Sequence, residues 1–172
     1  MAFTNTLATG ERAQRKMLIT VAGWQESGSE VREILGARTE DSSIEFNADI
    51  ATSTDILGIT YTDVNKTEPQ QTFDPFYLMG GSKLGQYLTD AALVNDIQKY
   101  NGKFNVYIIT AFLTESNKYF AVKHEGCSII PTSMGGDAYT SMPIEVHYSN
   151  KITEGSVDKL SDDFVFTPKA SA

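Results

Sequence analysis

The sequence predicts a mainly β fold: two packed antiparallel sheets, arranged as a sandwich or partly closed barrel and flanked by one α-helix. About eight short runs are rich in β-branched and aromatic residues and end at Gly, Pro, Asn or Ser, as strands do. A single run repeats its apolar residues at helical spacing. With 172 residues, 41% of them hydrophobic, the chain is long enough for one core. We therefore expect a single domain over residues 1–172, with short polar arms at 1–16 and 169–172.

The first predicted hairpin lies near the N-terminus. Residues 17–22 (MLITVA) and 31–35 (VREIL) are short apolar runs that contain β-branched residues. The Ser/Gly-rich segment 25–30 between them has the composition of a turn. This pattern predicts two antiparallel strands joined by that turn.

A second, acidic hairpin follows. In residues 43–50, apolar and polar residues alternate with the period of a strand that has one buried and one solvated face. The predicted buried residues are Ile44, Phe46, Ala48 and Ile50. Glu45 and Asp49 would then share the solvated face. Residues 51–54 (ATST) predict the turn and residues 56–66 the returning strand.

Residues 67–82 (TEPQQTFDPFYLMGGS) are predicted to form a long connection, because they contain two prolines and a Gly pair. Connections of this length are uncommon inside compact domains and are usually functional, or become ordered when a partner binds. Five of its residues would be costly to leave in water: Phe73, Phe76, Tyr77, Leu78 and Met79. We expect them to pack on the domain or on a partner.

The helix is predicted to begin after Ser82, a favourable N-cap, and to run through residues 83–94. Its apolar stripe comprises Leu84, Tyr87, Leu88, Ala91 and Val94. Three more apolar residues fall on the opposite side of an ideal helix: Leu93, Ile97 and Tyr100. Either the helix breaks near Asn95 and Asp96, which are weak helix formers, or its second face contacts another surface. We favour the break.

Strands also dominate the C-terminal half. The apolar runs 104–113 and 119–130 flank a polar link at 114–118 and predict a further hairpin. Three features follow: a glycine-bearing loop at 131–141, an alternating strand at 143–149 and a short last strand at 163–167.

The negative charge is concentrated in one segment. Residues 39–75 carry eight acidic residues against Lys66 alone, which accounts for −7 of the formal net charge of −8. The eight are Glu40, Asp41, Glu45, Asp49, Asp55, Asp63, Glu68 and Asp74. A surface with this charge repels phosphate, and a constitutive nucleic-acid-binding protein usually has a basic patch instead. We expect DNA to pass nearby without binding tightly.

The sequence offers little for catalysis. His124 and His147 are the only imidazoles, and both lie in predicted strands. Cys127 follows His124 by three residues, so we expect the two side chains on opposite faces of a strand, unable to act as a nucleophile and base pair. Neither a phosphate-binding glycine motif nor a calcium-loop pattern occurs. We predict that the protein is not an enzyme and has no cofactor and no metal.

The compartment is predicted from cysteine count and hydropathy. A lone cysteine excludes an intrachain disulfide, which is consistent with folding in a reducing cytoplasm. The first twenty residues lack a continuous apolar stretch of the signal-peptide type. No run approaches the roughly 20 apolar residues that span a membrane, so we expect no membrane insertion.

Several motifs, in their order and spacing, resemble one protein family. They are the acidic segment 39–75, the run 80–84 (GGSKL) at the predicted helix start, the run 126–131 (GCSIIP), and Gly135-Gly136-Asp137 before the strand at 143–149. Together they resemble the major tail tube protein of long, non-contractile-tailed bacteriophages. The resemblance covers residues 30–149.

The resemblance implies a structural virion protein whose subunits close into hexameric rings. The rings stack into the tail tube that conducts the genome into the host. The implied partners are other copies of the chain, the tape measure, tail terminator and distal tail proteins, and viral DNA in transit without tight binding. The implied location is the tail of the virion, after assembly in the bacterial host cytoplasm. We expect the rings to close by pairing of edge strands.

If the chain is a tail tube subunit, two sets of residues are candidates for contacts with DNA and with the next ring. Glu45 and Asp49 are candidate channel-lining residues, because a carboxylate wall offers DNA no cation to bind. The candidate ring-stacking loop contains Glu68, Phe73, Asp74, Phe76 and Tyr77. We expect deletion of residues 68–74 to leave a folded protein that no longer polymerises.

An alternative from another class stays open at this stage: a β-sandwich carbohydrate- or receptor-binding module of a phage tail tip. A sugar-binding face usually displays aromatic side chains as platforms, and the only tryptophan is Trp24. The acidic residues also have a simpler interpretation, in which they keep a virion protein soluble.

Overall fold

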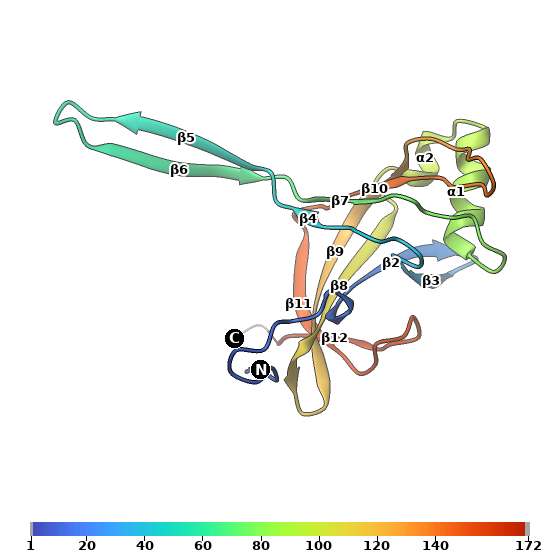
Figure 1. The fold of residues 1–172 in the computed structure, drawn as a ribbon, viewed down its shortest axis with the longest axis horizontal. Helices are drawn as coiled ribbons and strands as arrows, with labels where there is room; N and C mark the ends of the chain where they lie inside the picture. Colours follow the sequence, from blue (N-terminus) through green and yellow to red (C-terminus); the bar gives the residue numbers. More distant parts are fainter. Residues whose placement is uncertain (1, 171–172) are drawn as a thin grey trace.

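A computed structural model describes residues 2–170 of the chain (Figure 1). Within them, the strands are β1 (Thr4–Asn5), β2 (Leu18–Glu26), β3 (Ser29–Ile34), β4 (Ile44–Glu45), β5 (Ala48–Thr54), β6 (Thr60–Thr67), β7 (Gln70–Phe73), β8 (Phe104–Glu115), β9 (Lys118–Pro131), β10 (Ile144–His147), β11 (Ile152–Val157) and β12 (Phe166–Pro168). The helices are α1 (Lys83–Leu93), α2 (Ile97–Tyr100) and a short 3-10 helix, η1 (Arg15–Met17). Strands make up 47% and helices 11%, which confirms the predicted mainly β class with one main helix.

Ten strands form one antiparallel sheet whose main order is β3-β2-β8-β9-β10-β7-β4. The sheet curls so that β7 lies across from β2, where Thr20 Oγ1 donates to Gln71 Oε1 over 3.0 Å in the buried interior. It does not close into a barrel. The predicted hairpins β2–β3 and β8–β9 are confirmed, and β10 alternates as predicted. The sequence prediction missed β1 and β11 and placed the last strand three residues too early.

The curled sheet forms two layers, one that contains β2 and one that contains β7, and strand β9 bends from the first into the second. Its first half pairs with β11, and its second half, from Ser128, pairs with β10. Between these halves Gly126 adopts φ +76°, and the register with β8 shifts by one residue. A bulge of this kind bends a strand, and glycine adopts the left-handed conformation without a steric penalty. This bulge therefore positions β10 and β7 over the interior.

Two hydrophobic clusters hold the body together. The larger lies between the layers and is covered by α1; its largest members include Trp24, Phe73, Leu88, Phe104 and Met142. The smaller lies beneath the connection from β11 to β12 and contains Val21, Tyr107, Ile109, Ala121, Val157 and Phe164. Burial of these side chains is the main favourable contribution to folding.

Helix α1 begins where the sequence predicts and ends one residue earlier, at Leu93. Ser82 Oγ accepts a hydrogen bond from the Gly85 amide over 3.0 Å, as an N-cap does. The chain leaves the helix at Asn95, whose φ is +53°, and α2 starts after it, which confirms the break. Leu84, Leu88 and Ala91 are buried as predicted. Val94 was predicted on the buried stripe but is 70% exposed, because the helix has already ended there.

The acidic hairpin exists, but its buried face and its turn were predicted wrongly. Asn47, with φ +43°, separates β4 from β5, so residues 43–50 are not one strand. Residues 51–54 continue β5, and the turn lies at residues 55–59. Every residue of β5 and β6 is exposed, including the predicted core residues Ala48 and Ile50. Figure 1 shows the reason: the hairpin extends away from the body, so no part of this chain covers it.

The connection at residues 67–82 is also more ordered than predicted. It contains β7, which lies in the sheet between β10 and β4. Phe73 and Phe76 are 1% and 7% exposed, in the main cluster. Deletion of residues 68–74 would remove β7 and Phe73 together, so the expectation that such a deletion leaves a folded protein is wrong.

Candidate assembly surface

The hairpin β5–β6 has two chemically different faces. Paired residues on antiparallel strands point to the same side of the sheet. One face is uncharged and consists of Ile50 opposite Val64, Thr52 opposite Thr62 and Thr54 opposite Thr60. The other face pairs Asp49 with Lys66, Ala51 with Asp63 and Ser53 with Tyr61. Ile50 and Val64 are 58% and 61% exposed, so the uncharged face carries aliphatic surface into water.

The tip of the hairpin is fixed by Asp55. Its Oδ1 accepts from the amides of Leu57 and Ile59 over 2.8 and 2.9 Å, and its Oδ2 accepts from the Tyr61 hydroxyl over 3.2 Å. These hydrogen bonds, that from Ile59 above all, lower the pKa of Asp55. Gly58 supplies the left-handed residue of the turn, with φ +77°. Ile56 and Leu57 project beyond it, 103% and 78% exposed.

The two candidate channel residues do not share one strand face. Glu45 lies on β4 in the body, where its Oε2 accepts from Gln70 Nε2 over 3.3 Å. Asp49 lies on β5, opposite Lys66 and beside a bulge in the hairpin. The left-handed residue Asn47 between them interrupts the alternation on which the prediction rested. Both carboxylates are exposed.

The five candidate residues of the ring-stacking loop are not all at the surface. Phe73 and Phe76 pack on this domain, one of the two outcomes expected from the sequence. Glu68 and Asp74 are exposed, and Glu68 accepts from Lys66 Nζ over 2.7 Å. Tyr77 is half-buried and bridges to Ser141. In this conformation the loop presents carboxylates, and not its phenylalanines, to the surface.

Strand edges add to the surface that a second chain can use. In the described residues, β3 and β4 stand at the two ends of the main strand order, each paired on one side. The hairpin β5–β6 is a separate two-stranded sheet. Unpaired edges present backbone donors and acceptors that another strand can complete.

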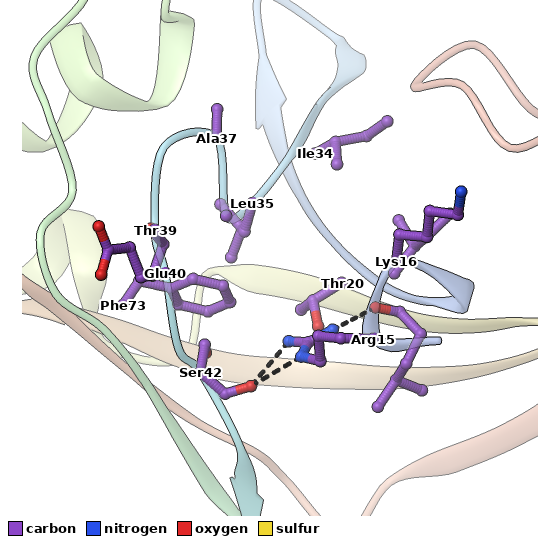
Figure 2. A pocket seen from close by; sticks show the side chains of 13 residues that line it. Arg15, Lys16, Thr20, Ile34, Leu35, Ala37, Thr39, Glu40, Ser42 and Phe73 are labelled. Atoms are coloured by element: carbon purple, nitrogen blue, oxygen red, sulfur yellow. Dashed lines mark hydrogen bonds between the residues drawn. The ribbon is translucent and has the colours of Figure 1, made fainter. Parts of the chain in front are cut away.

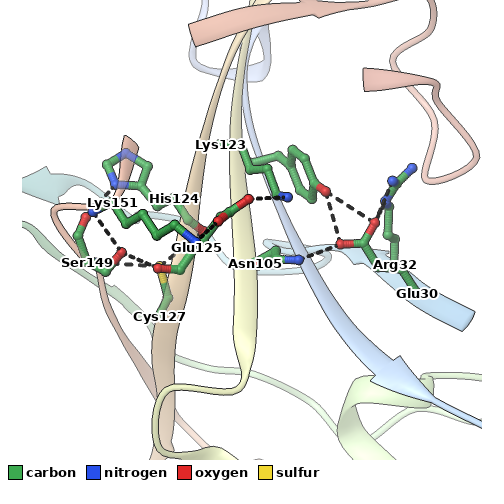
Figure 3. Close-up of polar contacts among 10 residues, drawn as sticks. Glu30, Arg32, Asn105, Lys123, His124, Glu125, Cys127, Ser149 and Lys151 are labelled. Carbon is green, nitrogen blue, oxygen red and sulfur yellow. Dashed lines mark hydrogen bonds and ion pairs between the residues drawn. The ribbon is translucent and has the colours of Figure 1, made fainter. Parts of the chain in front are cut away.

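The first of two polar clusters on the body surrounds Glu30 (Figure 3). Its carboxylate accepts from Asn105 Nδ2 over 2.8 Å, from Arg32 Nε over 2.7 Å and from the Tyr107 hydroxyl over 3.0 Å. Burial alone would raise the pKa of Glu30, but these hydrogen bonds and the charge of Arg32 outweigh it and lower the pKa. Burial and the nearby Glu30 carboxylate raise the pKa of Tyr107. The cluster ties β3 to β8.

The second polar cluster surrounds Glu125, between Lys123 and Lys151. Hydrogen bonds from these two lysines lower the pKa of Glu125 to about 2. The cluster links β9 to the segment that precedes β11. Both clusters satisfy their own charges, and neither resembles an acid and base pair aimed at a substrate.

His124 and Cys127 lie differently from the prediction. The bulge at Gly126 shifts the register, so His124 is paired with Val106 and Cys127 with Phe104, which share one face of β8. The two side chains are therefore on the same side of β9, and the expectation of opposite faces is wrong. The thiol nevertheless contacts the His124 carbonyl oxygen, while His124 Nδ1 lies 2.9 Å from the Ser149 carbonyl oxygen (Figure 3). Burial raises the pKa of Cys127, which disfavours the thiolate.

Within residues 2–170, no three His, Cys, Asp or Glu side chains are grouped so that they could hold a metal ion. Among the helices of the same part of the chain, none is long and apolar enough to cross a membrane.

The chain matches no protein-family profile and no curated protein sequence. Among solved structures it is similar to the tube-terminating cap of the anti-feeding prophage, with a TM-score of 0.47 and 12% identity over 87% of this chain and 95% of that chain. It is also similar to a chain of the PVC sheath-tube complex in its extended state, from an extracellular contractile injection system. That likeness has a TM-score of 0.46 and 15% identity over 85% of this chain and 93% of that one.

Proposed function

We propose that this protein is a structural subunit of a phage tail tube, which closes into hexameric rings that stack and conduct the genome into the host. The projecting hairpin β5–β6 is the observation that carries the proposal. An isolated two-stranded hairpin is at best marginally stable in water, and this one also exposes Ile50, Ile56 and Leu57. Cover from another chain would stabilise it.

The position of the hairpin β5–β6 in the molecule determines which type of assembly it can form. The hairpin is at one end of the molecule and α1 and α2 are at the other (Figure 1). A contact between a hairpin and a different part of the next copy is heterologous, and repeated heterologous contacts generate closed rings or open filaments. The unpaired edges of β3 and β4 supply further contacts by strand pairing.

The acidic side chains give this tube a wall that repels DNA. We propose that Asp49 and Asp63, on one face of the hairpin, face the channel, and that Glu45 does so separately from β4. A wall of carboxylates provides no Lys or Arg to replace the counterions of DNA, so the genome passes without tight binding. The proposed partners are the tape measure, tail terminator and distal tail proteins. The proposed location is the virion tail, assembled in the host cytoplasm, and the proposed role is not enzymatic.

Carbohydrate binding has less support. Trp24, the only tryptophan, is 1% exposed and packs on Tyr87 and Phe104 in the core. It is therefore not available as a surface platform for a sugar ring.

The direct test is to remove the hairpin and image the protein. The Glu68 amide donates to the Phe46 carbonyl oxygen over 3.1 Å, so the ends of residues 48–67 are already held together, and a two-residue Asn-Gly link can replace them. We expect the wild-type chain to form tubes in negative stain and the deletion variant to stay monomeric with an unchanged Tm. A wild-type chain that remains monomeric at high concentration, or a deletion variant that still forms tubes, would refute the proposal.

A further inference from the structure

A cavity of about 440 Å³ opens on the body beside β2 and β3 (Figure 2). Its floor is apolar and includes Leu35 and Phe73, which are 6% and 1% exposed. Ile34, 37% exposed, forms part of its wall. The cavity is therefore a partly open hollow whose floor belongs to the main hydrophobic cluster.

The mouth of the cavity is mainly basic. Arg15 donates from Nε and Nη2 to the Ser42 carbonyl oxygen, over 3.1 and 2.7 Å, which holds η1 against the segment that leads to β4. Lys16 also lines the mouth. Two further charged residues lie in the chain between lining residues: Arg38, between Ala37 and Thr39, and Asp41, between Glu40 and Ser42. Lys16 and Arg38 are exposed, and within residues 2–170 neither forms an ion pair. Glu40 is the one carboxylate among the lining residues.

The tip of the hairpin has the complementary chemistry. Ile56 and Leu57 form a fully projecting aliphatic knob, and Asp55 places a carboxylate directly beside it in the turn. The tip cannot reach the cavity of its own chain. Seven residues of β5, at about 3.3 Å each, carry it about 23 Å outward, and Figure 1 shows it pointing away from the body.

We propose that this cavity is the receptor for the hairpin tip of a second copy of the chain. The aliphatic knob covers the apolar floor, and the Asp55 carboxylate beside it meets the basic mouth. The inference rests on the proposed tube function and adds to it the place where each hairpin docks. Opposite charges at the mouth steer the encounter and fix its orientation, while burial of the knob provides the main attraction.

Disulfide trapping tests this contact directly. A chain that carries both Leu57→Cys and Ala37→Cys places one thiol on the knob and one at the mouth, on positions that are both exposed. The native Cys127 is 1% exposed and does not compete. The control chain carries Leu57→Cys with Val94→Cys, because Val94 is equally accessible, at 70% exposed, but lies beyond the end of α1. Both chains are assembled, oxidised and separated without reductant.

We expect a ladder of covalent multimers from the first chain and monomers from the control. A charge reversal supports the same conclusion: Lys16→Glu should weaken assembly at least tenfold at low salt, whereas Lys103→Glu, at an exposed lysine away from the cavity, should not. Normal tubes without the ladder would overturn this inference and leave the proposed function standing. If neither chain assembles while wild type also stays monomeric, both the inference and the proposed function fail.

Discussion

Strand β10 and the run at residues 43–50, which ends in β5, have the same kind of alternating sequence, but their last apolar residues have opposite surroundings. In β10, Ile144 and Val146 are fully buried, whereas in β5 Ile50 is 58% exposed. The pattern identifies which side chains share a face, but not what covers that face. For β10 the cover is the rest of the domain. For β5 no part of the same chain other than β6 is near, so its aliphatic face stays exposed and is the surface proposed above for contact with another copy.

The same difference in burial separates the whole body from the whole hairpin β5–β6. The body buries two hydrophobic clusters and holds Glu30 and Glu125 in local polar networks. The hairpin has no buried residue. Substitutions in the body should therefore change the free energy of unfolding of the monomer, and substitutions in the hairpin should change assembly.

A matched pair of phenylalanines gives the largest contrast. Phe73 is 1% exposed and Phe46, just before the hairpin, is 66% exposed. Phe73→Ala should lower the free energy of unfolding by about 3–5 kcal/mol, through lost burial and the cavity left behind. Phe46→Ala should change it by no more than about 0.5 kcal/mol. Urea unfolding measures both, and a comparable loss in the two variants would show that the hairpin base is packed like the body.

The body could be predicted largely from the sequence because its signals are local. Ser82 as N-cap, the break at Asn95 and the turn before β9 all follow from residue types that favour one backbone conformation. Asn47 and Gly126 carried weaker signals, because a left-handed residue inside a strand pattern breaks or bulges it without changing the hydrophobic period. The cavity beside β2 and β3 joins segments far apart in the sequence, from Arg15 to Phe73, so no spacing rule could reveal it.

The buried polar network of the body provides the next test. Glu30→Gln removes the charge that Arg32, Asn105 and Tyr107 all contact, and should cost about 1–3 kcal/mol. The pKa of Glu30 is lowered in the folded state, so its contribution is fully present above the unfolded pKa of about 4.3 and is lost as the pH falls through the folded value.

The wild-type chain should therefore lose stability as the pH falls below about 5, and the Glu30→Gln variant should lose less over the same pH range. Chemical unfolding at several pH values measures this slope. The pKa of Glu125 is also lowered, so Glu125 makes the free energy of unfolding fall with pH in the same direction. The pH dependence of the variant is therefore compared with that of the wild type and not with zero. Equal slopes in the two proteins would show that Glu30 does not titrate with folding.

A pair of serines compares the body with the hairpin through a smaller expected change in stability. Ser82→Ala removes the N-cap of α1 and the hydrogen bond that Ser82 Oγ donates to Glu33 over 2.7 Å. It should lower the free energy of unfolding by about 1 kcal/mol. Ser53→Ala, on the exposed hairpin, should leave it unchanged within about 0.5 kcal/mol. A loss at Ser53 as large as that at Ser82 would mean that the hairpin contributes to the stability of the monomer.

The candidate channel residues should have the smallest effect on stability. A DNA-retention assay is therefore needed to distinguish the hairpin residue from the body residue. Asp49→Lys in the hairpin and Glu45→Lys in the body change exposed side chains, so each should shift the free energy of unfolding by no more than about 0.5 kcal/mol. In assembled tubes, however, each channel-facing lysine should attract phosphate and retain short duplex DNA at low salt, with release as salt screens the charge. Asp90→Lys, on the exposed side of α1, is the control with the same charge change.

Retention by Asp49→Lys alone would place the hairpin, and not β4, on the channel wall. Retention by neither variant, in tubes of normal appearance, would assign both carboxylates to the outer surface, where their negative charge keeps the assembled particle soluble.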